Sequence, residues 1–390
     1  MSGRRRWWTR RDVLRAGRGW LAAGAAGAAA VALERLAEAA PGATGRAGDA
    51  APAPSPTGVA GSDKRTVTLL RELIQQRAVS STEPWLMAHV ILALGPDVKD
   101  GKRSILDAMV ADSLEVTTVG DKTYPQFVLK IERHPFHFLQ ILQVAEVPYD
   151  RRFATPVGTF TRREIVQGSE AAFDPTRHLD EASWTISVLT HEFPPDRDRF
   201  RTARGQDVVV SSLVEEHLRD TEAAYAATFA SMNEGKPYGR GVIHTKACNG
   251  AHLIYGLIDA LRYSYRGDDL KARFDRLIRA TIFRLQLEQK LVDATLRGDD
   301  PMIRLNADAV KLSFLGHVLE DIGYAISCGV LKLDASQLEA TALARRQLGQ
   351  VVDRITSEHD LDLLRANVPN AYGLVLGDAC HALRGMLYWT

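Results

Sequence analysis

The chain has 390 residues, of which 45% are hydrophobic and 25% charged, an ordinary composition for a globular protein. Basic and acidic side chains are nearly balanced, at 49 against 48. Residues 1–40 hold eight arginines and three acids, so the remainder carries a charge of about −4. That charge offers no electrostatic basis for nucleic-acid binding, and we expect none.

The amino-terminal segment has the order of features of an export signal. The pair Arg10-Arg11 is followed by Asp12, two apolar residues and a basic one, and an Ala- and Gly-rich stretch continues to Leu33. This arrangement resembles a twin-arginine signal, with a small-x-small cleavage site at residues 37–39. Residues 1–40 are therefore interpreted as a signal segment, which implies passage through the twin-arginine export machinery to the periplasm or the exterior. The alternative is an arginine-rich start before an ordinary helix.

Residues 41–62 are rich in Pro, Ala and Gly and predict a linker that cannot bury a core. Beyond the signal, no run approaches the ~20 apolar residues of a membrane-spanning helix, so we expect no integral membrane domain in the mature protein. Three cysteines is an odd number. In an oxidising compartment at least one of them is unpaired, bonded to another molecule or bound to a metal.

From residue 63 onward, apolar side chains at helical spacing predict helices in which charged and low-charge segments alternate. The charged helices are expected at 65–77, 103–114, 162–173, 208–232, 270–296 and 336–357. The low-charge helices are expected at 82–94, from 134, and at 180–191, 248–263, 309–328 and 374–389. Thr82 is the expected N-cap of the first low-charge helix, with Pro84 in its first turn. Residues 116–129 predict a small β-hairpin or irregular insertion.

Each low-charge helix carries a histidine, and six of these recur at intervals of 48 to 65 residues. The six are His89, His137, His191, His252, His317 and His381. A repeat of this length accommodates one helical hairpin, and such repeats bury their faces only against their neighbours. We therefore predict an all-α fold over residues 63–390, an (α/α)6 toroid with two rings of helices around a central funnel. An open helical solenoid is the alternative, but it would not direct the polar side chains to one place.

The stretch from Ala247 to Asp259 contains candidate metal ligands. If it forms one α-helix, Cys248, His252 and Tyr255 share a face. A cysteine and a histidine one turn apart can bind one zinc ion, the one cofactor that the residues suggest. Ligands from other helices would have to complete the site, and those available are His317, Cys380 and His381. The alternative is a buried cysteine beside a hydrogen-bonded histidine.

Two further helices place a carboxylate one turn from a histidine. His317 and Glu320 lie at i, i+3, and Asp378 and His381 repeat that spacing. Such a carboxylate orients the ring and raises its pKa, which suits a general acid or base. A structural polar contact is the equal alternative. The candidate substrate-binding residues are Trp85, His89, Trp184, His191, Asn249 and Tyr255. The histidines expected to be solvated, because they lie in charged stretches, are His178, His217, His244 and His359.

Three segments carry a resemblance to a known superfamily: residues 134–139, 248–252 and 316–320. They are similar to segments of the terpenoid-cyclase and prenyltransferase-like toroids, and more narrowly of a family of secreted bacterial proteins within them. The resemblance covers roughly residues 80–390 and implies an (α/α) toroid, but no defined activity. The Asp-x-Asp-Asp acid of class II terpene cyclases is missing, so terpene cyclisation is not expected. Lantibiotic cyclases bind zinc through a Cys and a Cys-His pair, which Cys248 and Cys380-His381 match in residue type but not in spacing.

These observations predict an extracytoplasmic enzyme of hydrolase or lyase type. Its substrate would be small or polymeric and polar, such as a carbohydrate, by analogy with other toroids. The competing hypothesis is a non-catalytic module that binds a ligand or a peptide. Convergence of His317, Glu320, Asp378 and His381 within about 5 Å, with a strongly shifted pKa, would favour catalysis.

Overall fold

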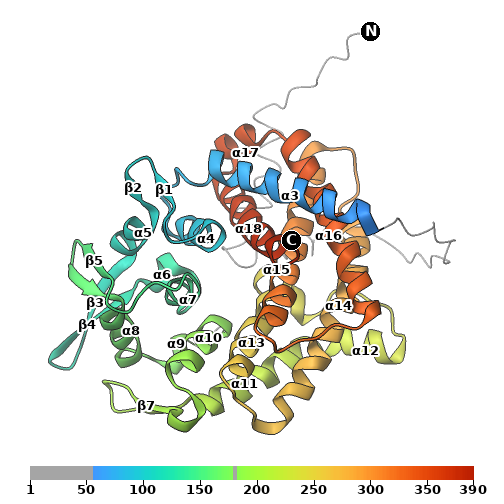
Figure 1. The fold of residues 1–390 in the computed structure, drawn as a ribbon. Coiled ribbons are helices and arrows are strands. Elements are labelled where there is room, and N and C mark those ends of the chain that lie inside the picture. Colours follow the sequence, from blue (N-terminus) through green and yellow to red (C-terminus); the bar gives the residue numbers. More distant parts are fainter. Residues whose placement is uncertain (1–55, 179–181) are drawn as a thin grey trace.

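The computed structural model describes residues 56–178 and 182–390. This part of the chain is mostly helical, with four small two-stranded antiparallel sheets between the helices (Figure 1). The predicted helical class is confirmed. The predicted signal segment, residues 1–40, lies outside the described residues. None of the described helices is both long and apolar enough to cross a membrane.

Twelve of the described α-helices form two groups that alternate along the chain. The inner group corresponds to the low-charge segments and consists of α4 (Pro84–Leu94), α7 (His137–Val144), α10 (Ser183–Glu192), α13 (Tyr255–Arg262), α15 (Pro301–Ser327) and α18 (Pro369–Leu387). The outer group consists of α3 (Pro56–Arg77), α5 (Ile105–Ser113), α8 (Arg162–Ala171), α11 (Val210–Ala224), α14 (Leu270–Thr295) and α16 (Ala335–Ser357). The remaining α-helices are α6 (Leu129–Glu132), α9 (Pro175–His178), α12 (Ala226–Glu234) and α17 (Leu361–Asn367). Helix α3 begins inside the predicted linker.

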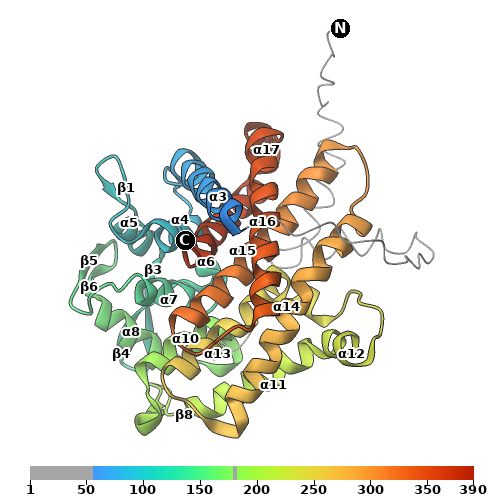
Figure 2. The same ribbon diagram turned by 45° about the vertical axis from the view of Figure 1, so that its right-hand side comes forward.

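Each inner helix packs against the next one in the chain, and α18 also packs against α4. Outer helices cover them: α5 lies against α4, α11 against α10 and α13, and α14 and α16 against α15 (Figure 2). Helix α3 packs on both α16 and α18. The two ends of the described chain are therefore side by side, as Figures 1 and 2 both show.

The predicted hairpin near residues 115–130 is confirmed. Strand β3 (Leu114–Val119) pairs antiparallel with β4 (Lys122–Phe127). The turn contains Gly120, whose φ of 65° lies in the left-handed region that glycine adopts without steric penalty. The remaining strands form three further ribbons, β1 (Lys99–Asp100) with β2 (Arg103–Ser104), β5 (Arg152–Thr155) with β6 (Gly158–Thr161), and β7 (Arg199–Arg201) with β8 (Asp207–Val209).

Two local predictions are wrong. The N-cap of α4 is Glu83 and not Thr82, because the Glu83 side chain accepts a hydrogen bond from the backbone N–H of Leu86 at 2.9 Å. The stretch from Ala247 to Ile254 forms short 3-10 turns instead of an α-helix. Within it, φ is 48° at Cys248, 54° at Asn249 and 72° at Gly250. The continuous helical stripe expected from Cys248 onward therefore does not exist, and α13 begins only at Tyr255.

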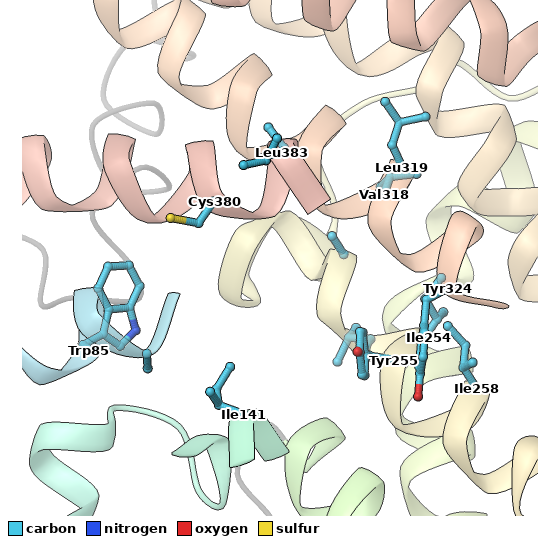
Figure 3. Close-up of a cluster of buried hydrophobic side chains, with 14 of the residues drawn as sticks. Trp85, Ile141, Ile254, Tyr255, Ile258, Val318, Leu319, Tyr324, Cys380 and Leu383 are labelled. Carbon is cyan, nitrogen blue, oxygen red and sulfur yellow. The ribbon is translucent and has the colours of Figure 1, made fainter. Parts of the chain in front are cut away.

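The inner helices share one hydrophobic core (Figure 3). Four different helices contribute fully buried side chains to it, namely Ile141, Ile258, Val318 and Leu383. Cys380 is equally buried within this core. Its thiol is therefore packed as a small hydrophobic group, not as the metal ligand that the sequence made available. No disulfide joins the three cysteines, all of which lie in the described part of the chain.

Candidate metal centre and active site

A cavity with about 180 Å³ of free space lies among the inner helices. We call it the first cavity. The residues on its wall come from the amino-terminal halves of α4, α7, α10, α15 and α18 and from the turns before α13. Most of the predicted site residues line it: Trp85, His89, Trp184, Cys248, Asn249, His252, His317 and Asp378.

Five of the six repeated histidines meet beside this cavity and form what we call the histidine cluster: His89, His137, His252, His317 and His381. The ring centroids of His317 and His381 are 3.9 Å apart, and those of His252 and His317 are 4.3 Å apart. His89 joins the cluster 4.9 Å from His381 and 5.1 Å from His137. All five residues are buried, with at most 8% exposure.

The cluster is uncharged at neutral pH. Burial lowers the pKa of His89 to about 3 and that of His317 to about 4. Burial also lowers the pKa values of His137, His252 and His381 well below 6.5, and neighbouring histidines add to the effect. The expected rise in the pKa of His317 and His381 is therefore wrong, because the loss of solvation outweighs the nearby carboxylates. Neutral imidazoles leave one ring nitrogen as an acceptor or a metal ligand.

Hydrogen bonds determine which ring nitrogen of each histidine is left as the acceptor or metal ligand. The Nδ1–H groups of His89 and His317 donate to the backbone carbonyls of Trp85 and Ser313, each at 2.6 Å. A carbonyl can only accept, so Nε2 of both rings keeps its lone pair. Nδ1 of His381 bonds to Oε2 of Glu320 at 2.5 Å. Its buried Nε2 has no hydrogen-bond partner among the described residues.

The two carboxylates pair with histidines of the neighbouring helix and not with those of their own. Glu320 on α15 contacts His381 on α18, while Asp378 on α18 lies 3.9 Å from Nδ1 of His317 on α15. Burial raises the pKa of both carboxyls to about 7. These pairs form because α15 and α18 approach closely: a Cβ atom at Gly385 would lie 2.8 Å from the carbonyl oxygen of Gly316.

Cys248, His252 and His317 bring three ligand atoms within 4.8 Å of one another. Zinc bonds of ~2.0–2.3 Å require tetrahedral ligands to be somewhat closer, about 3.5 Å apart, so only small side-chain movements separate this arrangement from a bound state. A thiolate and two neutral imidazoles are a donor set that zinc prefers. The bond from His317 Nδ1–H to a carbonyl is the second contact that metal-binding histidines commonly make. The residues therefore fit a zinc ion.

No protein-family model, curated protein or solved structure matches this chain. The resemblance to the toroid families therefore rests on the motifs alone.

The backbone at Cys248 is strained and is supported by a buried ion network. Cys248 and Asn249 are left-handed without being glycine, and such residues cost about 1 kcal/mol or more each. Nη2 of Arg284 donates to the carbonyl of Asn249 at 2.7 Å and to Oε1 of Glu288 at 2.8 Å. Burial raises the pKa of Glu288, but Arg284 and His244 outweigh it and bring the pKa to about 2. Strain that is supported by a buried ion network is typical of a functional position.

This network at the site was not predicted from the sequence. His244 bonds to Glu288 at 2.9 Å, His217 to the carbonyl of Leu253 at 2.9 Å, and His359 to Asp308 at 3.0 Å. The prediction that these three histidines are solvated is wrong. The side chain of His178 lies outside the description. The only signal in the sequence was the i, i+4 pair Arg284/Glu288, which is common on exposed helices.

Two predicted substrate-binding residues lie elsewhere. His191 lines a different cavity, at the carboxyl-terminal end of α10. Tyr255 is buried and stacks on Tyr324 with ring centroids 4.9 Å apart, so it borders neither cavity (Figure 3). Trp85 and Trp184 do line the first cavity, where their rings lie 4.0 Å from His89 and 4.6 Å from His252.

Proposed function

We propose that this protein is an extracytoplasmic enzyme of hydrolase or lyase type whose first cavity holds a zinc ion. The observation that carries the proposal is the convergence of Cys248, His252 and His317, whose ligand atoms lie within 4.8 Å of one another. His317 lies 65 residues after His252 in the sequence, and Cys248 stands on a strained backbone. Stability alone gives no reason to gather them.

The proposal includes the (α/α)6 toroid as the scaffold. Support comes from the sequence of contacts α4, α7, α10, α13, α15, α18 and back to α4, with outer helices alternating between them in the chain. A ring closed in this way gives every inner helix two neighbours of its own kind and directs one stripe of each to the centre. An open solenoid would leave α4 and α18 apart.

The residues of the first cavity take separate roles. A zinc ion on Cys248, His252 and His317 would supply Lewis acidity and lower the pKa of a coordinated water. The carboxyl of Asp378, with its pKa near 7, is suited to take up and return a proton at neutral pH. Glu320 orients His381 through the bond to Nδ1. Trp85 and Trp184 form an apolar wall behind the histidines.

The size of the cavity limits the substrate. A space of about 180 Å³ is close to the ~150 Å³ that accommodates one six-membered ring. Neutral imidazoles and the carboxyl of Asp378 on the wall of the cavity can form hydrogen bonds with a substrate. One ring of a polar substrate such as a carbohydrate, free or at the end of a polymer, suits this combination.

The test begins with metal analysis of the purified full-length protein. We expect one zinc per chain, retained on dialysis, in the native protein and in Cys328→Ser, the thiol control outside the first cavity. Cys248→Ser and His317→Ala should each lose it. Asp378→Asn should keep the zinc but lose at least 100-fold in turnover of a panel of nitrophenyl glycosides and esters. Equal metal content in Cys248→Ser and native protein would contradict the zinc site. A zinc protein that turns over none of the panel but binds a sugar would favour the non-catalytic alternative.

Export is proposed from residues 10 and 11, which lie outside the described residues. Arg10→Lys combined with Arg11→Lys should retain folded protein in the cytoplasm, measured by cell fractionation and protease resistance. Normal secretion of the double variant would refute the twin-arginine assignment.

A further inference from the structure

A second cavity, of about 700 Å³, lies at the opposite ends of the same inner helices. Its wall includes His191 at the end of α10, Arg262 at the end of α13, Tyr324 near the end of α15 and Arg384 near the end of α18. On α18, six residues separate Asp378 in the first cavity from Arg384 in the second, about 9 Å at 1.5 Å per residue. The volume falls within the ~300–1,000 Å³ typical of small-molecule sites.

The charges on this wall are mainly positive. Arg162, Arg262 and Arg384 line the cavity, against the single carboxylate Glu146. Arg162 and Arg384 are at most 9% exposed. Since arginine stays protonated under all ordinary conditions, the cavity carries a fixed positive charge.

These guanidinium groups bond mainly to neutral partners. Arg262 donates to the hydroxyl of Tyr324 at 2.8 Å, and Arg384 donates to that of Tyr388 at 3.0 Å. Arg162 donates to the carbonyl of Val147, and its buried Nε has no hydrogen-bond partner among the described residues. Buried arginines are usually paired with carboxylates, whereas the buried Arg162 and Arg384 and the more exposed Arg262 hydrogen-bond to neutral groups around one cavity and leave charge for a ligand.

The nearest carboxylates are occupied elsewhere. Glu192 accepts a hydrogen bond from Tyr149 at 2.5 Å and bonds to His191 at 3.0 Å. Asp259 lies 4.0 Å from Arg262 but is bonded to Tyr324 at 2.5 Å and to Ser187. Glu320 lies 3.4 Å from Nη1 of Arg384 without the alignment of a hydrogen bond, and its other oxygen is bonded to His381.

We propose that the second cavity binds an organic oxyanion, a carboxylate or a phosphate carried on a ring. Arg262 and Arg384 would hold the anionic group, because their donors already lie together with tyrosine hydroxyls on the wall. Tyr149 and Tyr263 line the same cavity and supply aromatic rings beside its arginine guanidinium groups, a setting that suits a sugar or aromatic ring. This site is separate from the proposed zinc site and does not depend on it.

Calorimetric titration of the full-length protein tests the proposal, with glucuronate as the carboxylate probe, inorganic phosphate as the phosphate probe and glucose as the neutral control. We expect saturable binding of at least one anion and none of glucose; the better probe identifies the anionic group. Arg262→Gln should weaken binding about tenfold, the effect of one charge-assisted hydrogen bond near the surface. The matched control is Arg266→Gln, four residues further along, which removes an exposed arginine outside the cavity and should bind like the native protein.

A second variant keeps the test independent of any effect of Arg262 on folding. Ser327 lies on the exposed rim of the cavity. Ser327→Glu adds a negative charge there and should abolish anion binding while zinc content remains unchanged. Equal affinities in Arg262→Gln and Arg266→Gln, equal heats with glucose and glucuronate, or no saturable anion binding would each overturn the second site.

Discussion

The two cavities occupy opposite ends of the same helices and differ in chemistry. The first is small and is built from neutral histidines, a thiol and a carboxyl with a pKa near 7. The second is larger and is lined mainly by arginines and tyrosines, with His191 on the same wall. The inner helices have two ends, so one set of helices can carry a site of neutral imidazoles and a site with arginine charge.

The two cavities are connected through the side chain of Glu320. Glu320 bonds to His381 with one oxygen, and its other oxygen faces Arg384 at 3.4 Å. One carboxylate thus contacts both His381 of the histidine cluster and Arg384 of the second cavity. The position of a residue along an inner helix, and not only the face it occupies, therefore decides which cavity it lines. Four substitutions test this difference between the two cavities.

The largest effect is expected beneath the first cavity. Arg284→Leu leaves Glu288 buried without its guanidinium partner, and breaking a buried ion pair in this way costs roughly 3–5 kcal/mol. It also removes the donor that holds the carbonyl of Asn249. Urea unfolding measures the loss. Arg279→Leu, on the exposed face of the same helix, should change stability by no more than about 0.5 kcal/mol. A similar loss in both variants would show that the network does not support the cavity.

Asp378→Asn tests the protonation of the first cavity. The pKa of Asp378 is near 7 in the folded protein against about 3.9 unfolded. Between these values the folded state holds a proton that the unfolded state has released, so this group's stabilisation is complete below pH 4 and declines as pH rises to 7. Between these two pKa values, the contribution of Asp378 to the free energy of unfolding falls by about 1.4 kcal/mol per pH unit. The buried histidines contribute the opposite slope in both proteins, because their folded pKa values are lowered.

The measurement is the difference in unfolding free energy between native protein and Asp378→Asn at pH 4.5, 5.5 and 6.5. The native protein should lose stability relative to the variant as pH rises. Asp362→Asn is the control. Arg77 lowers the pKa of that exposed carboxyl, so any pH dependence of stability that it contributes lies below pH 4.5. A constant difference for Asp378 would mean that its carboxyl is ionised throughout.

Glu320→Gln tests the path between the cavities. At pH 8.5, above the pKa of Glu320 near 7, the substitution removes a negative charge beside Arg384. Anion affinity in the second cavity should rise about three- to tenfold. Asp321→Asn is the matched control, because this neighbouring buried carboxyl forms no ion pair with Arg384 among the described residues. Calorimetric titration with the better anion probe compares the two. An unchanged affinity in Glu320→Gln would show that the cavities are electrostatically independent.

The smallest effect is expected between the cavities. The Tyr255 hydroxyl is buried with no hydrogen-bond partner among the described residues. Tyr255→Phe should therefore leave stability within about 0.5 kcal/mol of native, or raise it slightly, and leave both binding activities unchanged. Tyr324→Phe should destabilise by about 1–3 kcal/mol, since it removes bonds to Asp259 and Arg262. Thermal unfolding and ligand titration measure both. Lost substrate binding in Tyr255→Phe alone would restore the role predicted from the sequence.

Much of the helical framework could be predicted from the sequence, because apolar periodicity is a local property. The alternation of charged and low-charge helices and the hairpin around Gly120 were both foreseen. So were most residues of the first cavity, since one histidine on each low-charge helix indicates a shared interior. The 3-10 turns at Cys248 were missed because left-handed residues other than glycine leave little trace in composition. They are supported by the hydrogen bond from Arg284 to the carbonyl of Asn249, 35 residues earlier in the chain.

Tertiary structure alone decided the partners and the protonation states. The sequence by itself placed Glu320 with His317 and Asp378 with His381, one turn apart on their own helices. The structure pairs each carboxyl with the other helix, because the glycines of α15 and α18 let the backbones approach. Burial then lowers the histidine pKa values that a neighbouring carboxylate alone would raise. Periodicity records which face of a helix is buried, whereas distances between helices and the loss of water depend on residues far apart in the chain.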